Sequence, residues 1–110
     1  MTTSDERHLK ALRLLDDNPQ MTQRQLAKAL GVSLGAANYC LRALVDKGWV
    51  KLENFHRNPN KLGYLYLLTP QGVAARTRLA ARFLKRKVEE YERLKSEIES
   101  LREEVGGGNG

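Results

Sequence analysis

Hydrophobic positions in the first part of the chain recur every three or four residues, which predicts an α-helix over about residues 4–17. Thr3 can cap this helix, because Glu6 follows three residues later and completes a capping-box pattern. The sequence Asp-Asn-Pro at 17–19 is expected to end it. The apolar stripe expected to face a core consists of Leu9, Ala11, Leu12, Leu14 and Leu15.

The next two helices have clear start and stop signals. Thr22 and Gln25 form a second capping-box pattern, and Gly31 is placed to end that helix in a left-handed conformation. Ser33 can cap a third helix, which should run to about Lys47 before Gly48 stops it. Two helices joined by a short turn that contains glycine form the helix-turn-helix pattern. The residues expected on their core side are Leu26, Ala27 and Leu30, then Ala37, Leu41, Leu44 and Val45.

After Gly48 the period changes from that of a helix to that of strands. Residues 49–53 and 64–69 alternate and are β-prone, whereas residues 54–63 are rich in turn formers. The pattern predicts a β-hairpin with a basic tip, which we call the wing. Val50 and Leu52 should share one face of its first strand, and Leu65 and Leu67 one face of its second.

The last part of the chain predicts one long helix. Thr69 can cap it and Pro70 suits its first turn. An unbroken helix to Val105 would be about 54 Å long, more than a small domain can cover. Its apolar residues repeat every seven positions, with a second set three residues after the first, as in a coiled coil. These dimerisation positions are Leu84, Tyr91, Leu94, Ile98, Leu101 and Val105.

Charges beside this apolar repeat favour a parallel homodimer. A parallel pair would place Glu90 against Lys95 and Glu97 against Arg102 of the second chain. An antiparallel pair would place acid against acid. Each exposed pair contributes only about 0.2–1 kcal/mol, so the charges set orientation more than stability. The alternative is a lone amphipathic helix that folds back on its own domain.

Composition narrows the class of protein. The chain has 110 residues and a formal net charge of +6, from 19 Lys and Arg against 13 Asp and Glu, which suits a polyanionic partner. Its one cysteine, Cys40, cannot form an intramolecular disulfide, and we interpret it as a small buried hydrophobe rather than a redox sensor. There is no metal-ligand spacing, phosphate loop or catalytic constellation, so we expect no metal, no cofactor and no enzyme activity. Without a signal peptide or membrane span, the protein is expected in the cytoplasm.

One face of the third helix carries few charges for a solvated surface, and we interpret it as the surface that reads DNA bases. Small residues at its start would allow close approach to the groove floor. Asparagine can read adenine and arginine can read guanine or hold a phosphate, while tyrosine can contact a phosphate or a thymine methyl. The predicted base-reading residues are Gly35, Ala36, Asn38, Tyr39 and Arg42.

Two further groups are predicted to contact the DNA backbone and the minor groove. The start of the second helix offers free N–H groups and polar side chains to phosphates. The predicted backbone contacts are Thr22, Gln23, Arg24 and Ser33. The basic wing tip suits a narrow minor groove. Its residues are His56, Arg57, Asn58, Asn60 and Lys61. The basic run 76–87 either reaches flanking phosphates or is a solvated helix face.

Together these patterns predict a mainly α, α+β fold with three parts. Residues 1–72 would be a winged helix-turn-helix DNA-binding domain, residues 73–105 a long helix that forms a parallel dimeric coiled coil, and residues 106–110 a disordered tail. The expected partners are double-stranded DNA and a second copy of the chain, with no membrane. The alternative is a winged-helix adaptor that binds protein and no DNA.

The segments TQRQLAKALGVS, LVDKGWV and LLTPQG resemble the MarR-type winged helix regulators. The longer segments SLGAANYCLRALVDKGWVKLENF, NKLGYLYLLTPQG and RFLKRKVEEYERLKSEIE resemble, more narrowly, the MarR-type regulators associated with exopolysaccharide gene clusters. The narrower resemblance covers about residues 6–104. It implies a bacterial regulator that controls transcription of extracellular polysaccharide biosynthesis genes.

Overall fold

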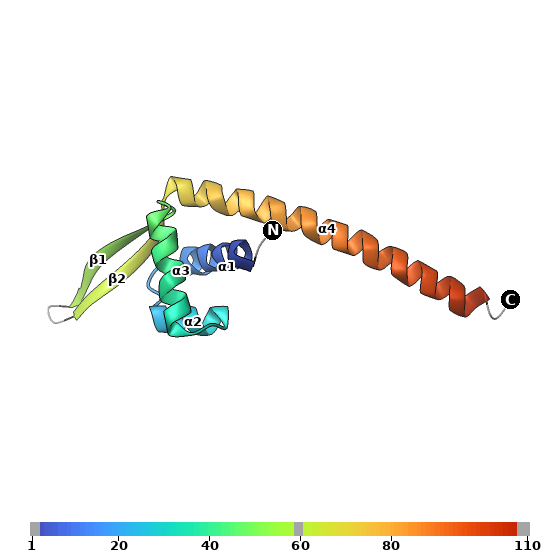
Figure 1. Cartoon of the computed structure of the whole chain (residues 1–110). Coiled ribbons are helices and arrows are strands. Elements are labelled where there is room, and N and C mark those ends of the chain that lie inside the picture. The colour runs from blue at the N-terminus through green and yellow to red at the C-terminus, as the bar shows by residue number, and fades with distance from the viewer. Residues whose placement is uncertain (1–2, 59–60, 108–110) are drawn as a thin grey trace.

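A computed structural model of the chain describes residues 3–58 and 61–107. The elements in chain order are α1 (Thr3–Asp17), α2 (Gln23–Leu30), α3 (Leu34–Asp46), β1 (Val50–Asn58), β2 (Lys61–Leu68) and α4 (Pro70–Gly107). The two strands pair as one antiparallel sheet. The first three helices and the base of the hairpin form a head, from which the hairpin and α4 extend in opposite directions (Figure 1). The mainly helical winged fold expected from the sequence is confirmed.

The predicted helix ends of the helix-turn-helix are confirmed at the level of single hydrogen bonds. Thr22 Oγ1 accepts from the Gln25 amide at 3.1 Å, while Gln25 Oε1 accepts from the Thr22 amide at 2.9 Å. Gly31 ends α2 at φ +71°, a left-handed conformation that suits glycine. Ser33 Oγ caps α3 by accepting from the Ala36 amide at 3.1 Å. The Gly31 and Ser33 contacts define the turn between α2 and α3.

The core lies between α1, α2, α3, the hairpin base and the start of α4. One predicted core position is wrong: Val45 is 39% exposed, while Cys40 is 2% exposed. The reason is angular, because Ala37, Cys40, Leu41 and Leu44 form one stripe on α3 and Val45 falls at its edge. Cys40 is therefore a buried hydrophobic residue, and burial raises the pKa of its thiol.

The hairpin is longer than the sequence pattern predicts. Pairing runs from Val50 opposite Leu68 to Asn58 opposite Lys61, so most of the expected turn 54–63 is strand. Cross-strand hydrogen bonds hold these residues extended in spite of their weak β-propensity. On β2, Tyr66 is buried, whereas Leu65 and Leu67 are half-buried on the other face.

Helix α4 runs unbroken for 38 residues and makes the molecule 77 Å long but only 25 by 21 Å across. Its first turns belong to the head, where Ala75 and Leu79 are buried. Contact with α1 continues as far as Arg86, and the rest of the helix extends away from the head (Figure 1), so the alternative in which the helix folds back on its own domain is wrong. The helix includes Gly106 and Gly107, and residues 108–110 of the expected tail lie outside the described residues.

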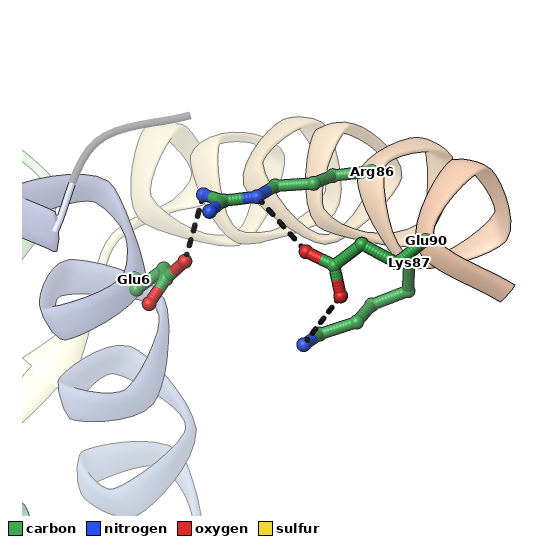
Figure 2. Close-up of polar contacts among 4 residues, drawn as sticks. All are labelled: Glu6, Arg86, Lys87 and Glu90. Atoms are coloured by element: carbon green, nitrogen blue, oxygen red, sulfur yellow. Dashed lines mark hydrogen bonds and ion pairs between the residues drawn. The ribbon is translucent and has the colours of Figure 1, made fainter. Parts of the chain in front are cut away.

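Ion pairs attach the near half of α4 to α1. Arg76 Nη1 lies 2.6 Å from Asp16 Oδ2, and Arg86 Nη1 lies 3.1 Å from Glu6 Oε1. Figure 2 shows Arg86 reaching Glu6 with one nitrogen and Glu90 with another. Because both pairs are largely exposed, they orient the two helices more than they stabilise them.

Candidate nucleic-acid interface

The side of α3 opposite its core stripe is open to solvent. Gly35 and Arg42 are exposed, and Tyr39 is 77% exposed, the largest fraction among the exposed large hydrophobic and aromatic side chains. Asn38 and Ala36 lie half-buried at the two edges of this face. The predicted base-reading residues therefore share one side of α3, with three at its centre and two at its margins.

Because Gly35 has no side chain, no side chain projects from the start of this face at that position. A methyl group built on Gly35 would have only Ser33 Oγ near it, at 4.0 Å. The surface around this residue is thus open space, and the backbone of the first turn of α3 is accessible. Such a surface allows a helix to approach a groove floor closely.

The Asn38 side chain is hydrogen-bonded to another side chain of the protein, a contact that the sequence did not predict. Its Nδ2 donates to Gln23 Oε1 at 3.0 Å, and Gln23 Nε2 donates to the Tyr66 hydroxyl at 3.4 Å. The chain of bonds joins α3 to the first residue of α2 and to β2. The sequence signal for it was weak, because these residues are 15 and 43 positions apart.

The predicted backbone contacts lie at the starts of α2 and α3. Thr22, Arg24 and Ser33 are exposed, and Gln23 is half-buried by its bonds to Asn38 and Tyr66. In both caps the hydroxyl oxygen accepts from a helix amide, which leaves the hydroxyl proton able to donate to an external acceptor. The early amides of each helix are likewise unused by the helix itself and favour anions.

The wing tip is described only as backbone. Asn60 lies outside the described residues, as does Pro59, and the side chains of His56, Arg57, Asn58 and Lys61 are not described. The backbone places residues 56–58 and residue 61 at the distal end of the hairpin, far from the core (Figure 1). A register irregularity between His56 and Asn58 lies within this distal end.

A close junction sets where the wing and α4 leave the head. The Thr69 hydroxyl donates to the Gly48 carbonyl at 2.6 Å and accepts from the Gly72 amide at 2.9 Å. The Thr69 amide donates to the Trp49 carbonyl at 3.0 Å. Thr69 was predicted only as a helix cap. The structure shows that it also ties the start of α4 to the end of α3.

A second cluster surrounds Trp49 at the same end of α3. His8 packs edge-on against the Trp49 ring at 6.2 Å, and Lys47 Nζ lies 5.0 Å from the centre of that ring. Partial burial and, secondly, the Lys47 charge lower the pKa of His8. His8 is therefore a neutral packing group near pH 7. Its contacts hold α1 against the base of the hairpin.

The basic run on α4 is divided between two roles. Arg76, Arg86 and Lys87 take part in ion pairs with acidic side chains. Within the described part of the chain, no ion pair involves Arg78, Arg82 or Lys85, which follow one another at helical spacing. The structure thus leaves only part of the run available to an external polyanion.

The described residues also bear on two further possibilities, a metal-binding group and a membrane-spanning helix. No group of three His, Cys, Asp or Glu side chains in them is arranged to hold a metal ion. None of their helices combines the length and apolarity that a membrane crossing requires.

The helical head matches a known protein family. Residues 4–51, from α1 to the start of β1, match the family described as "Winged helix-turn-helix DNA-binding". No curated protein matches the sequence. Solved structures, by contrast, share the fold over most of the chain.

Three of these structures show how far the similarity extends. The PcaV transcriptional regulator from Streptomyces coelicolor has a TM-score of 0.65 at 17% identity, over 100% of this chain and 77% of its own. Sso10a-2, a DNA-binding protein from Sulfolobus solfataricus, has a TM-score of 0.61 at 20% identity, over 92% of this chain and 96% of its own. The MarR family protein Rv2887 from Mycobacterium tuberculosis has a TM-score of 0.54 at 25% identity, over 84% of this chain and 76% of its own. The chain therefore carries a winged helix-turn-helix domain, and its structural neighbours include a regulator of the MarR family.

Proposed function

We propose that the protein is a sequence-specific DNA-binding transcriptional regulator that acts as a homodimer, and not an enzyme. The observation that carries this proposal is the outward face of α3, where Gly35, Tyr39 and Arg42 are exposed beside the half-buried Asn38. The major groove admits an α-helix, and recognition helices present their N-terminal part to base edges. This face has the size, position and hydrogen-bonding groups for that task.

In the proposed complex, α3 lies in the major groove and each group of residues has a separate role. Arg42 pairs with guanine or a phosphate, Asn38 reads adenine, and Tyr39 contacts a phosphate or a thymine methyl. Gly35 and Ala36 allow the close approach. Phosphates are bound by Thr22, Gln23, Arg24 and Ser33. The wing residues His56, Arg57, Asn58, Asn60 and Lys61 enter the adjacent minor groove.

The first test separates base reading from backbone binding. Arg42→Ala should lower discrimination at particular base pairs by about 5- to 150-fold, because a good bidentate contact contributes about 1–3 kcal/mol. Lys61→Ala should weaken all duplexes alike and reduce the slope of log affinity against log salt by about 0.9, the share of one phosphate contact. Fluorescence anisotropy at two salt concentrations measures both, with the duplex upstream of the protein's own gene.

The control for this test is Lys10→Ala, which removes an exposed lysine from α1. It should leave discrimination unchanged. If Arg42→Ala and Lys61→Ala both retain the affinity and selectivity of the unmodified protein, the proposed interface is wrong. If the unmodified protein shows no salt-dependent binding to any duplex, the chain is better described as a protein-binding adaptor.

The dimer is proposed from the exposed half of α4. Its apolar side chains follow the seven-residue repeat, yet Ile98 is 40% exposed and Val105 70% exposed. Within this stretch Arg86 contacts Glu6 of α1, and the remainder of the helix extends away from the head (Figure 1). Burial of such a stripe against a second copy releases about 25 cal/mol for each Å² of apolar surface removed from water. We infer that a coiled coil along residues 84–105 joins two chains and spaces the two α3 helices for half-sites about 34–36 Å apart or a multiple of that.

The two charge pairs that favour a parallel dimer differ in whether their residues already form ion pairs within one chain. Glu90 already bonds to Arg86 at 3.3 Å and Lys87 at 3.2 Å within its own helix, as Figure 2 shows. The Lys87 hydrogen bond is the main cause of a lowered pKa for Glu90. A pair between Glu90 and Lys95 of a second chain would therefore have to compete with these contacts. Glu97 and Arg102 are exposed and form no ion pair among the described residues, so they are the better orientation test.

Reversal of one charge should weaken a parallel dimer and strengthen an antiparallel one. In the parallel pair, Glu97→Lys places a lysine against Arg102 of the second chain, twice per dimer, so the dissociation constant should rise by about 3- to 30-fold. The double variant Glu97→Lys/Arg102→Glu should restore it. Sedimentation equilibrium at low salt measures the constants. Tighter association of the single variant would contradict the parallel orientation.

Control of extracellular polysaccharide biosynthesis genes is the finer part of the proposal and rests on the sequence resemblance alone. We place the protein in a bacterial cytoplasm on the same basis. Polysaccharide genes beside this one in the genome, and loss of their regulation on its deletion, would support the assignment. Unchanged transcript levels of such genes after deletion would contradict it.

A further inference from the structure

Three elements meet at the edge of the proposed base-reading face. Asn38 of α3 donates to Gln23 of α2 at 3.0 Å, and Gln23 donates to Tyr66 of β2 at 3.4 Å. Both bonds are partly buried. Asn38, which is proposed to read a base, is thus linked through Gln23 to a residue of β2.

An asparagine needs such support to read a base consistently. Its terminal torsion is broad and roughly two-fold, so a free carboxamide exchanges its oxygen and nitrogen positions. Bidentate pairing with adenine requires the oxygen opposite N6 and one N–H opposite N7. With the other N–H of Asn38 donated to Gln23, the oxygen and one N–H remain for the base.

Tyr66 provides a fixed end for this chain of bonds. Tyr66 is 7% exposed and belongs to the core, and its amide donates to the Pro19 carbonyl at 3.0 Å. The phenol oxygen is therefore held in place relative to α2. Because Gln23 turns its Nε2 towards this oxygen, its Oε1 is left to accept from Asn38. In this arrangement the nitrogen end of the Asn38 carboxamide is the donor to Gln23, and its oxygen points away from that bond.

We propose that Gln23 and Tyr66 are positioning residues that hold the Asn38 carboxamide in one orientation and so contribute to base choice without contacting the base. The proposal rests on the proposed DNA-binding function. It extends specificity from α3 to the first residue of α2 and to the base of the wing. The residues act through Asn38, and their effect should appear only at the base pair that Asn38 reads.

The experiment measures discrimination one base pair at a time. The unmodified protein first selects a preferred site from a library of random-sequence duplexes, and each base pair of that site is then substituted in turn. Asn38→Ala should lose about 5- to 150-fold discrimination at one base pair. Tyr66→Phe, which removes only the hydroxyl, should lose threefold or more at the same base pair and nothing at the pair read by Arg42. Added to Asn38→Ala, it should cause no further loss.

Matched variants separate positioning from other roles. Tyr64→Phe removes an exposed hydroxyl from the same strand and should behave as the unmodified protein. Gln23→Glu keeps an acceptor for Asn38 and should retain discrimination even where overall affinity falls. Gln23→Leu removes the acceptor and should lose discrimination. This pair tests the proposal independently if Tyr66→Phe lowers the melting temperature too far to be measured.

Three results would overturn the proposal. The first is that Tyr66→Phe and Gln23→Leu both keep full base-pair discrimination while Asn38→Ala loses discrimination. The second is a loss spread evenly over all base pairs, which indicates a structural role only. The third is full discrimination in Asn38→Ala. In all three the unmodified protein still binds DNA, so the proposed function stands; failure of the unmodified protein to bind any duplex would instead contradict the function itself.

Discussion

The double substitution Leu94→Glu/Ile98→Glu should convert the protein to a monomer and lower its affinity for a duplex with two half-sites by about 100-fold or more. Both side chains are apolar, 55% and 40% exposed, and at the centre of the predicted coiled coil. Two charges there would face two charges of the second chain in a desolvated seam. Loss of the dimer removes the gain from binding two linked sites, which is commonly about 10²- to 10⁴-fold.

The same change should leave the head folded. Neither residue belongs to the core cluster, and both side chains are exposed on α4. Affinity for a duplex with a single half-site should therefore be retained within about threefold, since no residue of the α3 face is altered. The two duplexes together distinguish loss of dimerisation from loss of the DNA-binding surface.

A control with equal charge is available on the same helix. Ser96→Glu/Ser100→Glu also adds two negative charges per chain, but at exposed positions outside the apolar repeat. It should remain dimeric. Light scattering gives the mass, and anisotropy gives the affinities. If the Leu94/Ile98 variant stays a dimer, or if the serine variant loses affinity to the same extent, the coiled coil is not the dimer interface.

Alanine at Gly72 should destabilise the fold by about 3 kcal/mol or more, the upper end of the range for overpacking. A methyl group there would overlap the Trp49 carbonyl oxygen and lie 2.8 Å from its carbonyl carbon. Both are backbone atoms that cannot rotate away. Thr69, which bonds to Gly48 and Gly72, would have to move with them, and the hairpin base would separate from α4.

Gly35→Ala is the matched control, because Gly35 also lies in the first turn of a helix and has open space beside it. Its stability should change by less than about 1 kcal/mol. Urea denaturation followed by circular dichroism measures both variants, and for a domain of this size each kcal/mol corresponds to about 4–8 °C in melting temperature. A Gly72→Ala protein as stable as Gly35→Ala would show that the junction tolerates a side chain.

Signals within a few residues of each other were sufficient to place the helix-turn-helix. Thr22 with Gln25, Gly31, Ser33 and Gly48 act through hydrogen bonds and backbone conformations that depend on close neighbours in the sequence. The central α3 residues of the candidate site follow from the same logic, because helical spacing alone separates Tyr39 and Arg42 from the buried stripe. The seven-residue repeat of α4 is likewise visible in the sequence.

Features that depend on distant partners were missed or wrong. The length of the hairpin follows from pairing across two strands, which extends through residues 54–58 despite their turn-forming character. The exposure of Val45, which was expected in the core, depends on which way α3 rotates against the other elements. The basic run of α4 is partly neutralised because α1 places Asp16 and Glu6 beside it.

Local signals in the sequence are enough to predict the ends of α2 and α3, the exposed centre of the α3 face and the long amphipathic helix, since each depends on residues at most a few turns apart. The bonds from Asn38 through Gln23 to Tyr66, and the lack of room for a side chain at Gly72 beside Trp49, arise only when the folded elements pack together. These contacts join residues 15 to 43 positions apart, whose meeting depends on how whole elements pack together. No local pattern records that packing, because it is the sum of many weak contacts across the core.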